Sequence, residues 1–150
     1  MAEYAVAKPP NVLVTLGLGS CIGLALYDQY SKVSGLIHFM LPNSNGKQNK
    51  AKYADTGIPF LINEMVKKGA SKSRIRAKIV GGARMFNFAD ENSAMNIGKR
   101  NSEAAKKILK EEGIKVIGED TGEDFGRTMR FYADSGEVKV TSYKRDDLTL

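Results

Sequence analysis

Residues 21–40 read CIGLALYDQYSKVSGLIHFM, and this stretch predicts a β-hairpin. Two apolar, strand-like runs, Ile22–Tyr27 and Val33–Met40, flank a polar turn. The stretch begins at Cys21, the only cysteine of the chain, and its second run contains His38, the only histidine. A hairpin here therefore brings the single thiol and the single imidazole together.

The length of the turn decides how these two side chains meet. A two-residue turn centred between Gln29 and Tyr30 places Cys21 directly opposite His38, with Cβ atoms roughly 4.5–5.5 Å apart. We predict this direct pairing. A four-residue loop over residues 29–32 is the alternative, and it leaves the two residues diagonal on one face. A shift of one residue would instead send the histidine to the other face.

A histidine close to a cysteine can ionise the thiol, and the thiolate is the nucleophilic form. The spacing thus predicts a Cys-His hydrolase. In such a site His38 lowers the pKa of Cys21, so this thiol alkylates faster than a free thiol near neutral pH. The alternative is purely structural: Cys21 is then a small buried hydrophobic residue and His38 a hydrogen-bonded strand residue.

Glycines interrupt the strand-like run just before the thiol, in the stretch TLGLGSC at residues 15–21. They permit a bulge or sharp bend and let a substrate approach the backbone. Amide groups freed near Gly19, Ser20 and Cys21 are candidates for binding a developing oxyanion. A bulge without a ligand is the alternative. A phosphate-binding loop is disfavoured, because the stretch lacks both the G-x-G-x-x-G pattern and a lysine followed by Ser or Thr.

Length and composition favour a single domain over residues 1–150. One cysteine cannot form an intramolecular disulfide, and no second Cys or His is present to build a metal cluster, so we expect a reducing compartment and no metal or cofactor. The N-terminus lacks the apolar core of a signal peptide, and no run approaches the ~20 apolar residues of a membrane span. We therefore expect a cytoplasmic protein without membrane insertion.

The formal net charge is +6, with a pI near 9.4. Such a balance suits nucleic acid, anionic lipid or an acidic protein surface. The basic residues are scattered, and no nucleic-acid-binding module accompanies them. An acidic protein partner is the better interpretation.

Two helices are predicted. The first begins at Asp55 or Thr56, ends at Gly69 and faces the core with Ile58, Leu61, Ile62, Met65 and Val66. The second runs from about Asn101, its expected cap, to Glu112 and faces the core with Ala104, Ala105, Ile108 and Leu109.

Seven strands are predicted, mostly in antiparallel pairs with the helices inserted between them. This order favours an α+β layered sandwich of mostly antiparallel sheet, with two main helices on one side. The expected strands are Val12–Leu18, Ile22–Tyr27, Val33–Met40, Arg76–Val80, Ile114–Gly118, Thr128–Ala133 and Val138–Tyr143.

Several motifs in fixed order resemble the CheD family of chemoreceptor glutamine deamidases. The resemblance covers nearly the whole chain and is carried by EYAV (3–6), VTLGLGSC (14–21), GLIHFMLP (35–42), KYADT (52–56), KIVGGARMF (78–86), MNIGKRN (95–101) and EDTG (119–122). In that family the cysteine of the GSC stretch is the nucleophile, the histidine its base, and a threonine before the glycines completes the triad. The resemblance assigns these roles to Cys21, His38 and Thr15.

The resemblance also implies an activity and partners. The activity is a cysteine-dependent deamidation of glutamines in the cytoplasmic domain of chemoreceptors, with release of ammonia and without a cofactor. Some members also hydrolyse receptor methyl esters and bind the phosphatase CheC, whose contact can occlude the catalytic groove. We expect a monomer.

The segment that follows the expected strand Arg76–Val80 has two interpretations. Met85 and Phe86 follow a glycine pair and form either a loop that binds a partner or a plug in the core.

Two rival classes stay open. One is a different thiol hydrolase, such as a peptidase or a toxin-like deamidase of another protein. The other is a non-catalytic adaptor that binds receptor or CheC and merely retains Cys21.

Overall fold

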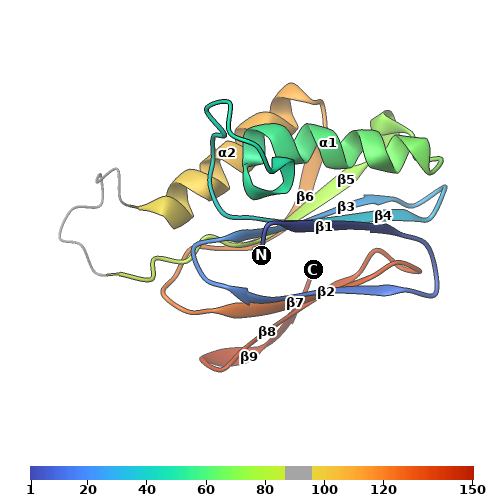
Figure 1. Cartoon of the computed structure of the whole chain (residues 1–150). Coiled ribbons are helices and arrows are strands. Elements are labelled where there is room, and N and C mark those ends of the chain that lie inside the picture. The colour runs from blue at the N-terminus through green and yellow to red at the C-terminus, as the bar shows by residue number, and fades with distance from the viewer. Residues whose placement is uncertain (87–95) are drawn as a thin grey trace.

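The computed structural model describes residues 1–86 and 96–150, so Met95 of the MNIGKRN motif lies outside the described residues. The fold has three layers (Figure 1). Helices α1 (Ala54–Lys67) and α2 (Ile97–Glu111) cover one face of a five-stranded sheet, and a four-stranded sheet covers the other face. The predicted α+β sandwich with two main helices on one side is confirmed.

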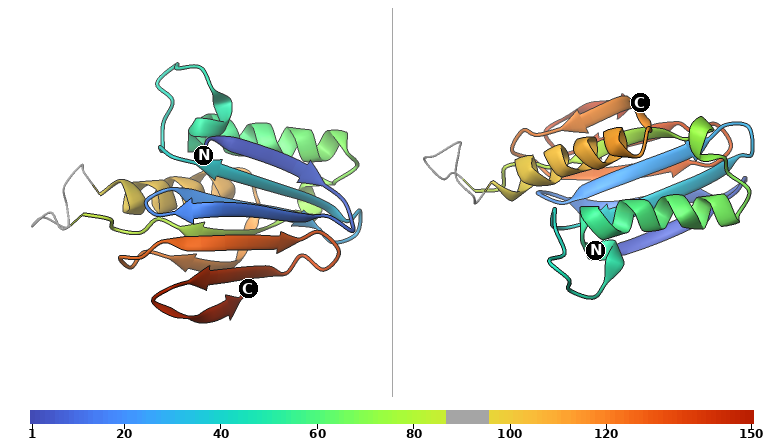
Figure 2. Two further views of the ribbon diagram at one scale, coloured as in Figure 1. Left: turned by 60° about the horizontal axis from the view of Figure 1, so that its bottom comes forward. Right: turned by 90° about the horizontal axis from the view of Figure 1, so that it is seen from above.

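The five-stranded sheet, here called sheet A, has the order β1-β4-β3-β5-β6, and only the β5–β6 pair is parallel. The four-stranded sheet, sheet B, is antiparallel throughout in the order β2-β7-β8-β9. Figure 2 shows the two sheets and the helices from two further sides. The strands are β1 (Glu3–Ala7), β2 (Val12–Leu18), β3 (Ile22–Asp28), β4 (Val33–Phe39), β5 (Arg76–Gly81), β6 (Lys115–Thr121), β7 (Arg127–Tyr132), β8 (Val138–Ser142) and β9 (Arg145–Thr149), with short 3-10 helices at Lys50–Lys52 and Lys72–Arg74.

All seven predicted strands are present, with ends that differ by up to three residues. The prediction missed β1 and β9. The missed β9 has the sequence RDDLT, in which three charged residues leave no alternation of apolar and polar positions. Both missed strands lie at the edge of their sheet, where few contacts demand a strong pattern.

The β3–β4 hairpin has the four-residue loop, because Asp28 pairs with Val33. Gly23, not Cys21, lies opposite His38. The predicted direct pairing of Cys21 and His38 is therefore wrong, and the diagonal alternative is confirmed. The side chain of Asp28 explains the loop length, since it accepts a hydrogen bond from the Tyr30 amide at 3.1 Å and so closes the turn locally.

Helix α1 begins after Tyr53, whose side chain makes no capping hydrogen bond. The predicted cap at Asp55 or Thr56 is wrong: Asp55 lies inside the first turn and accepts from the Ser44 amide at 2.9 Å. Gly69 follows the helix with φ +107°, as a terminating glycine should. Of the predicted core face, only Val66 is exposed.

Helix α2 begins earlier than predicted, and Asn96 caps it by accepting from the Lys99 amide at 3.1 Å. The predicted cap at Asn101 is wrong, because this residue lies within the helix and is fully buried. Ala105 and Leu109 enter the core, and Ala104 and Ile108 pack against it, as predicted.

Two apolar clusters hold the layers together. One fills the space between the helices and sheet A. The other lies between the two sheets and includes Leu18, Cys21, Leu36, Met129 and Phe131. The inter-sheet layer is where the residues singled out from the sequence come together.

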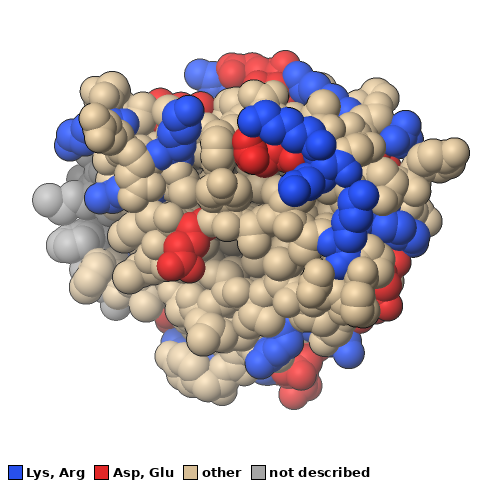
Figure 3. All heavy atoms as spheres, turned by 45° about the vertical axis from the view of Figure 1, so that its right-hand side comes forward, with Lys and Arg blue, Asp and Glu red and all other residues tan. Residues whose placement is uncertain are grey.

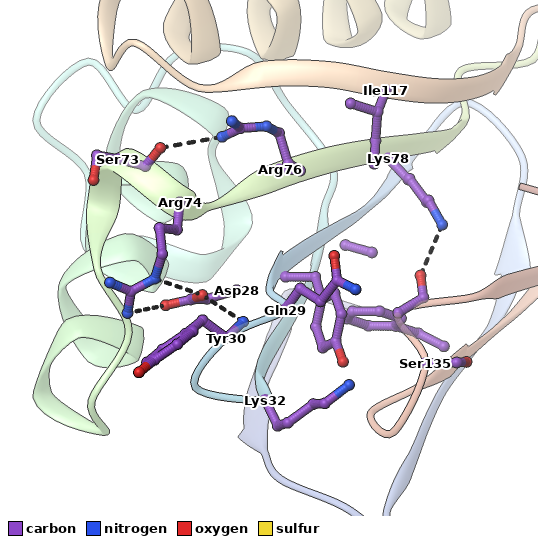
Figure 4. Close-up of a pocket in the computed structure, with 14 residues that line it drawn as sticks. Asp28, Gln29, Tyr30, Lys32, Ser73, Arg74, Arg76, Lys78, Ile117 and Ser135 are labelled. Atoms are coloured by element: carbon purple, nitrogen blue, oxygen red, sulfur yellow. Dashed lines mark hydrogen bonds and ion pairs between the residues drawn. The ribbon is translucent and has the colours of Figure 1, made fainter.

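A buried carboxylate fixes the far end of the β3–β4 hairpin (Figure 4). Asp28 is fully buried and accepts from Arg74 Nε at 3.0 Å, Arg74 Nη2 at 2.9 Å and the Ser71 amide at 2.9 Å. Burial opposes ionisation of this carboxyl, but the Arg74 guanidinium and the backbone amide donors outweigh it and hold the pKa of Asp28 well below its usual range.

We expect Asp28→Asn to lower the free energy of unfolding at pH 7 by about 2–4 kcal/mol, because it removes the negative charge that pairs with Arg74 and replaces one acceptor oxygen by an NH₂ donor. The native pKa of Asp28 is depressed, so its contribution is present above about pH 4 and is lost as the pH falls through the native pKa. Urea unfolding at pH 7 measures the first effect, and a series of unfolding curves from pH 5 down to pH 2 follows the progressive loss of the second.

The control for this substitution is Glu64→Gln, which removes a carboxylate from an exposed pair with Lys67. We expect it to change stability by less than about 1 kcal/mol. An Asp28→Asn protein as stable as this control at pH 7 would contradict the account.

Candidate active site

Thr15 and His38 meet across the two sheets. Thr15 lies on β2 in sheet B and His38 on β4 in sheet A, and Thr15 Oγ1 is 2.8 Å from His38 Nδ1 in a buried hydrogen bond. The pairing of β2 with β7 shifts between Thr15 and Leu18, at Gly17, which has φ +67°. Because of this bulge, the side chains of Thr15 and Leu18 both face the interior. The other ring nitrogen, His38 Nε2, is buried and has no hydrogen-bond partner among the described residues.

Gly23 makes the room for this contact. It lies opposite His38 on the neighbouring strand, and a Cβ there would stand 3.2 Å from the Thr15 methyl group and 2.9 Å from side-chain atoms of Leu18 and Met129. The space beside the imidazole is therefore filled from sheet B, and only glycine permits that approach.

Cys21 lies directly before β3 and belongs to the cluster between the sheets. Since Gly23 is opposite His38, Cys21 is diagonal to the histidine on the same face of sheet A, at a typical Cα separation of roughly 7–8 Å. Both are nearly buried, with 8% and 4% of their surface exposed. A small cavity of about 100 Å³ reaches the histidine from the β1–β2 side; Thr15, His38, Leu36 and Glu3 are among its lining residues, and Cys21 is not.

Burial favours the uncharged form of both groups of the pair. It raises the pKa of the Cys21 thiol, against smaller lowering effects of the Met1 amino group and the amide of Cys21 itself. It lowers the pKa of His38, assisted by the Met1 amino group and opposed by the Glu3 carboxylate. The lowered thiol pKa expected from the sequence is therefore wrong, because the desolvation of Cys21 exceeds the lowering effects of the Met1 amino group and the Cys21 amide.

We expect alkylation of Cys21 by iodoacetamide to be slower at pH 7 than that of glutathione. The half-maximal rate should lie above the ordinary thiol value of about 8.5, because a raised pKa leaves less thiolate at any given pH. The measurement is the alkylation rate between pH 6 and 10, followed by the mass of the intact protein. A midpoint near neutral pH would mean that a thiolate-imidazolium pair exists in the resting protein.

The segment after β5 lies against the loop that carries Cys21. The Met85 side chain packs on Gly19, where a Cβ would stand 3.1 Å from the Met85 sulfur. Phe86 is 72% exposed, so it does not plug the core. These two residues form an apolar rim beside the cysteine loop.

A larger cavity of about 710 Å³ lies at the other end of β3, roughly 20 Å from Cys21. Its walls include Lys32, Arg74, Arg76 and Lys78 (Figure 4). Lys and Arg side chains are also spread over this end of the molecule in Figure 3. Each cation of the cavity already donates to a protein oxygen, for example Lys78 Nζ to the carbonyl of Gly136 at 2.7 Å.

The sequence did not reveal two residues near the pair. Glu3 lies on the missed strand β1, opposite His38, and lines the same cavity. Asn101 reaches the cysteine loop from α2, where its amide donates to the Ser20 carbonyl at 2.9 Å. Only the EYAV and MNIGKRN motifs pointed to these positions, and neither motif states a role.

Neither a metal centre nor a membrane helix is found in the described ranges. Residues 1–86 and 96–150 contain no group of three or more His, Cys, Asp or Glu side chains that could hold a metal ion. Within the same ranges, each helix is too short or too polar to cross a bilayer.

Fold and site together define an α+β protein with a buried thiol beside a histidine that a threonine anchors. The family described as "CheD chemotactic sensory transduction" matches residues 40–142. The chain belongs to this family.

Curated relatives extend the similarity to residues outside the matched segment. The chain is 50% identical over 143 residues to a probable chemoreceptor glutamine deamidase CheD of Caldanaerobacter subterraneus, which covers 93% of this chain and 88% of the relative. It is 51% identical, with the same coverage, to the protein of that name from Clostridium novyi. An archaeal relative of that name, from Thermococcus kodakarensis, is 46% identical over 144 residues, covering 93% of this chain and 88% of the relative.

A solved structure shares the fold. The crystal structure of the hypothetical protein YfiH from Bacillus licheniformis aligns with a TM-score of 0.51 and 15% identity, over 81% of this chain and 49% of that chain. At this identity the similarity concerns the fold alone.

Proposed function

We propose that this protein is a chemoreceptor glutamine deamidase in which Cys21 is the nucleophile, His38 the general base and Thr15 the residue that orients the imidazole. The observation that carries the proposal is the Thr15–His38 hydrogen bond of 2.8 Å, which leaves Nε2 without a partner on the face that bears Cys21. The names of the relatives supply the substrate class.

The acylation step begins from the neutral pair. His38 Nδ1–H donates to Thr15 Oγ1, so Nε2 carries the lone pair and takes the proton of Cys21. The sulfur forms a bond to the carboxamide carbon of the glutamine, and the carbonyl electrons move to oxygen. His38 then returns its proton to the amide nitrogen, the C–N bond breaks, and ammonia leaves a thioester behind.

The second step hydrolyses the thioester. His38 takes a proton from water, the hydroxide oxygen attacks the acyl carbon, and the C–S bond breaks to give glutamate. Cys21 recovers its proton from His38. The neutral starting pair suits this cycle, since the proton moves only when a substrate carbon is there to receive the sulfur.

Thr15 is a neutral third member. It fixes the ring orientation, as the third residue of other triads does, but its hydroxyl can donate as well as accept and stabilises the imidazolium less than a carboxylate would. Glu3 lies on the same cavity and raises the pKa of His38, which partly replaces that missing charge.

The substrate approach is also part of the proposal. The rim formed by Met85 and Phe86 lies beside the cysteine loop and suits an apolar contact with a receptor helix or with CheC. The net charge of +6 favours partners rich in glutamate. A methyl ester offers the same thiol an equivalent acyl group, so receptor methylesterase activity fits the same site. A cytoplasmic location follows from this substrate.

The test is incubation with the cytoplasmic fragment of a chemoreceptor, followed by peptide mass spectrometry and an ammonia assay. Deamidation adds ~1 Da at a glutamine and releases ammonia without cutting the chain. Cleaved fragments would favour a peptidase instead. Receptor binding without any mass change would favour the adaptor.

A further inference from the structure

Three consecutive carbonyl groups of the cysteine loop are each held by a hydrogen bond. The Gly19 carbonyl accepts from the Ala83 amide at 2.8 Å, and the Cys21 carbonyl accepts from the Gly82 amide at 2.9 Å. The Ser20 carbonyl between them accepts from Asn101 Nδ2 at 2.9 Å. The outer two donors are main-chain groups, so a side chain determines only the middle contact.

Asn101 links this loop to the histidine strand. Its second donor contact runs to the Met40 carbonyl at 2.8 Å, two residues beyond His38. The residue is fully buried, and its Oδ1 has no hydrogen-bond partner in the described part of the chain. A buried acceptor left unpaired costs about 1–3 kcal/mol, so stability alone does not favour an asparagine here.

Because the peptide bond is planar, these contacts to carbonyl groups also fix the orientation of two backbone N–H groups. In a planar trans peptide the carbonyl of one residue and the N–H of the next point in opposite directions. Holding the Gly19 carbonyl therefore aims the Ser20 N–H, and holding the Ser20 carbonyl aims the Cys21 N–H. Neither of these two N–H groups makes a backbone hydrogen bond to a described residue.

We propose that Asn101 is a positioning residue that orients the Cys21 amide as an oxyanion donor and keeps the cysteine loop in place beside the histidine strand. This inference rests on the proposed deamidase function. Asn101 touches neither sulfur nor substrate; it acts through the Ser20–Cys21 peptide. An oxyanion donor must be aimed before the reaction, because its stabilisation comes from being preorganised.

The test compares two reactions of the same thiol. Deamidation passes through an oxyanion, whereas alkylation by iodoacetamide displaces iodide at a methylene carbon and develops none. We expect Asn101→Leu to lower kcat for deamidation by about 10–100-fold with KM nearly unchanged. The alkylation rate at pH 9 should stay within about threefold of the original protein.

The matched control is Asn96→Ala, which removes the cap of the same helix without touching the loop. It should weaken α2 by a similar amount and leave the ratio of deamidation to alkylation unchanged. Because an unfolded chain exposes Cys21 and alkylates it without deamidating, both rates are measured only on variants whose circular dichroism shows them to be folded. Asn101→Ser, a smaller side chain, serves if the leucine variant does not fold.

Each outcome decides the matter. A lower ratio in the Asn101 variants and an unchanged ratio in Asn96→Ala support the proposal. An unchanged ratio in the Asn101 variants overturns it and leaves the deamidase function intact. If the original protein does not deamidate receptors, or does so without Cys21, the proposed function fails, and the role inferred for Asn101 fails with it.

Discussion

Replacing Cys21 with alanine is expected to abolish deamidation, with a fall of at least about 10⁴-fold in kcat. No other residue of the chain has a thiol, so nothing in the site can take over formation of the thioester. The measurement is the ~1 Da gain on a receptor fragment under single-turnover conditions. Circular dichroism and receptor binding of the variant establish that it is folded.

The same variant separates the enzyme from the adaptor. In the adaptor interpretation the original protein and Cys21→Ala bind the receptor alike, and neither changes its mass. A Cys21→Ala protein that deamidates at an appreciable rate would exclude the thiol mechanism altogether.

His38→Gln is expected to lower kcat by about 10²–10⁴-fold, because the neutral amide cannot take the proton of Cys21. Thr15→Val, which keeps the shape of the side chain and removes its hydroxyl, should have a smaller effect of about 10-fold. Deamidation of a receptor fragment by each variant, quenched at successive times between pH 6 and 9, gives both values of kcat.

The double variant tests whether the two residues act as a unit. We expect Thr15→Val to add little in the His38→Gln background, since the threonine works through the imidazole. Independent effects that multiply would contradict the hydrogen-bonded arrangement seen between Thr15 Oγ1 and His38 Nδ1.

Periodicity predicted the layers of the fold because buried faces repeat along each element. Ile58, Leu61, Ile62 and Met65 follow the helical period and are all buried in α1. The edge strands were missed because they depend on partners far away in sequence, and the cap of α2 was misplaced by five residues, at Asn101 in place of Asn96. β1, for example, is defined only by its pairing with β4, and the role of Asn101 only by contact with Ser20.

At the site, the sequence correctly predicted that Cys21 and His38 lie close together, but it did not predict the direction in which the pKa of the thiol is shifted. Cys21 and His38 share a face in both hairpin registers considered, so their proximity survived an error of two residues in the pairing. The raised pKa of the thiol results from burial between the two sheets. No pattern within residues 21–40 indicates that sheet B covers this face.

The most direct test of the central claim uses a receptor peptide in which the reactive glutamine is replaced by a diazoketone analogue. The carbon that bears the diazo group takes the place of the amide nitrogen, next to the carbonyl carbon. It gains the proton of the thiol, forms a bond to the sulfur and loses nitrogen gas, so the modified residue is identified by mass. We predict one adduct per chain, on Cys21, whose formation is slowed strongly in His38→Gln. An adduct on another residue, or equal labelling of Cys21 in His38→Gln, would contradict the account.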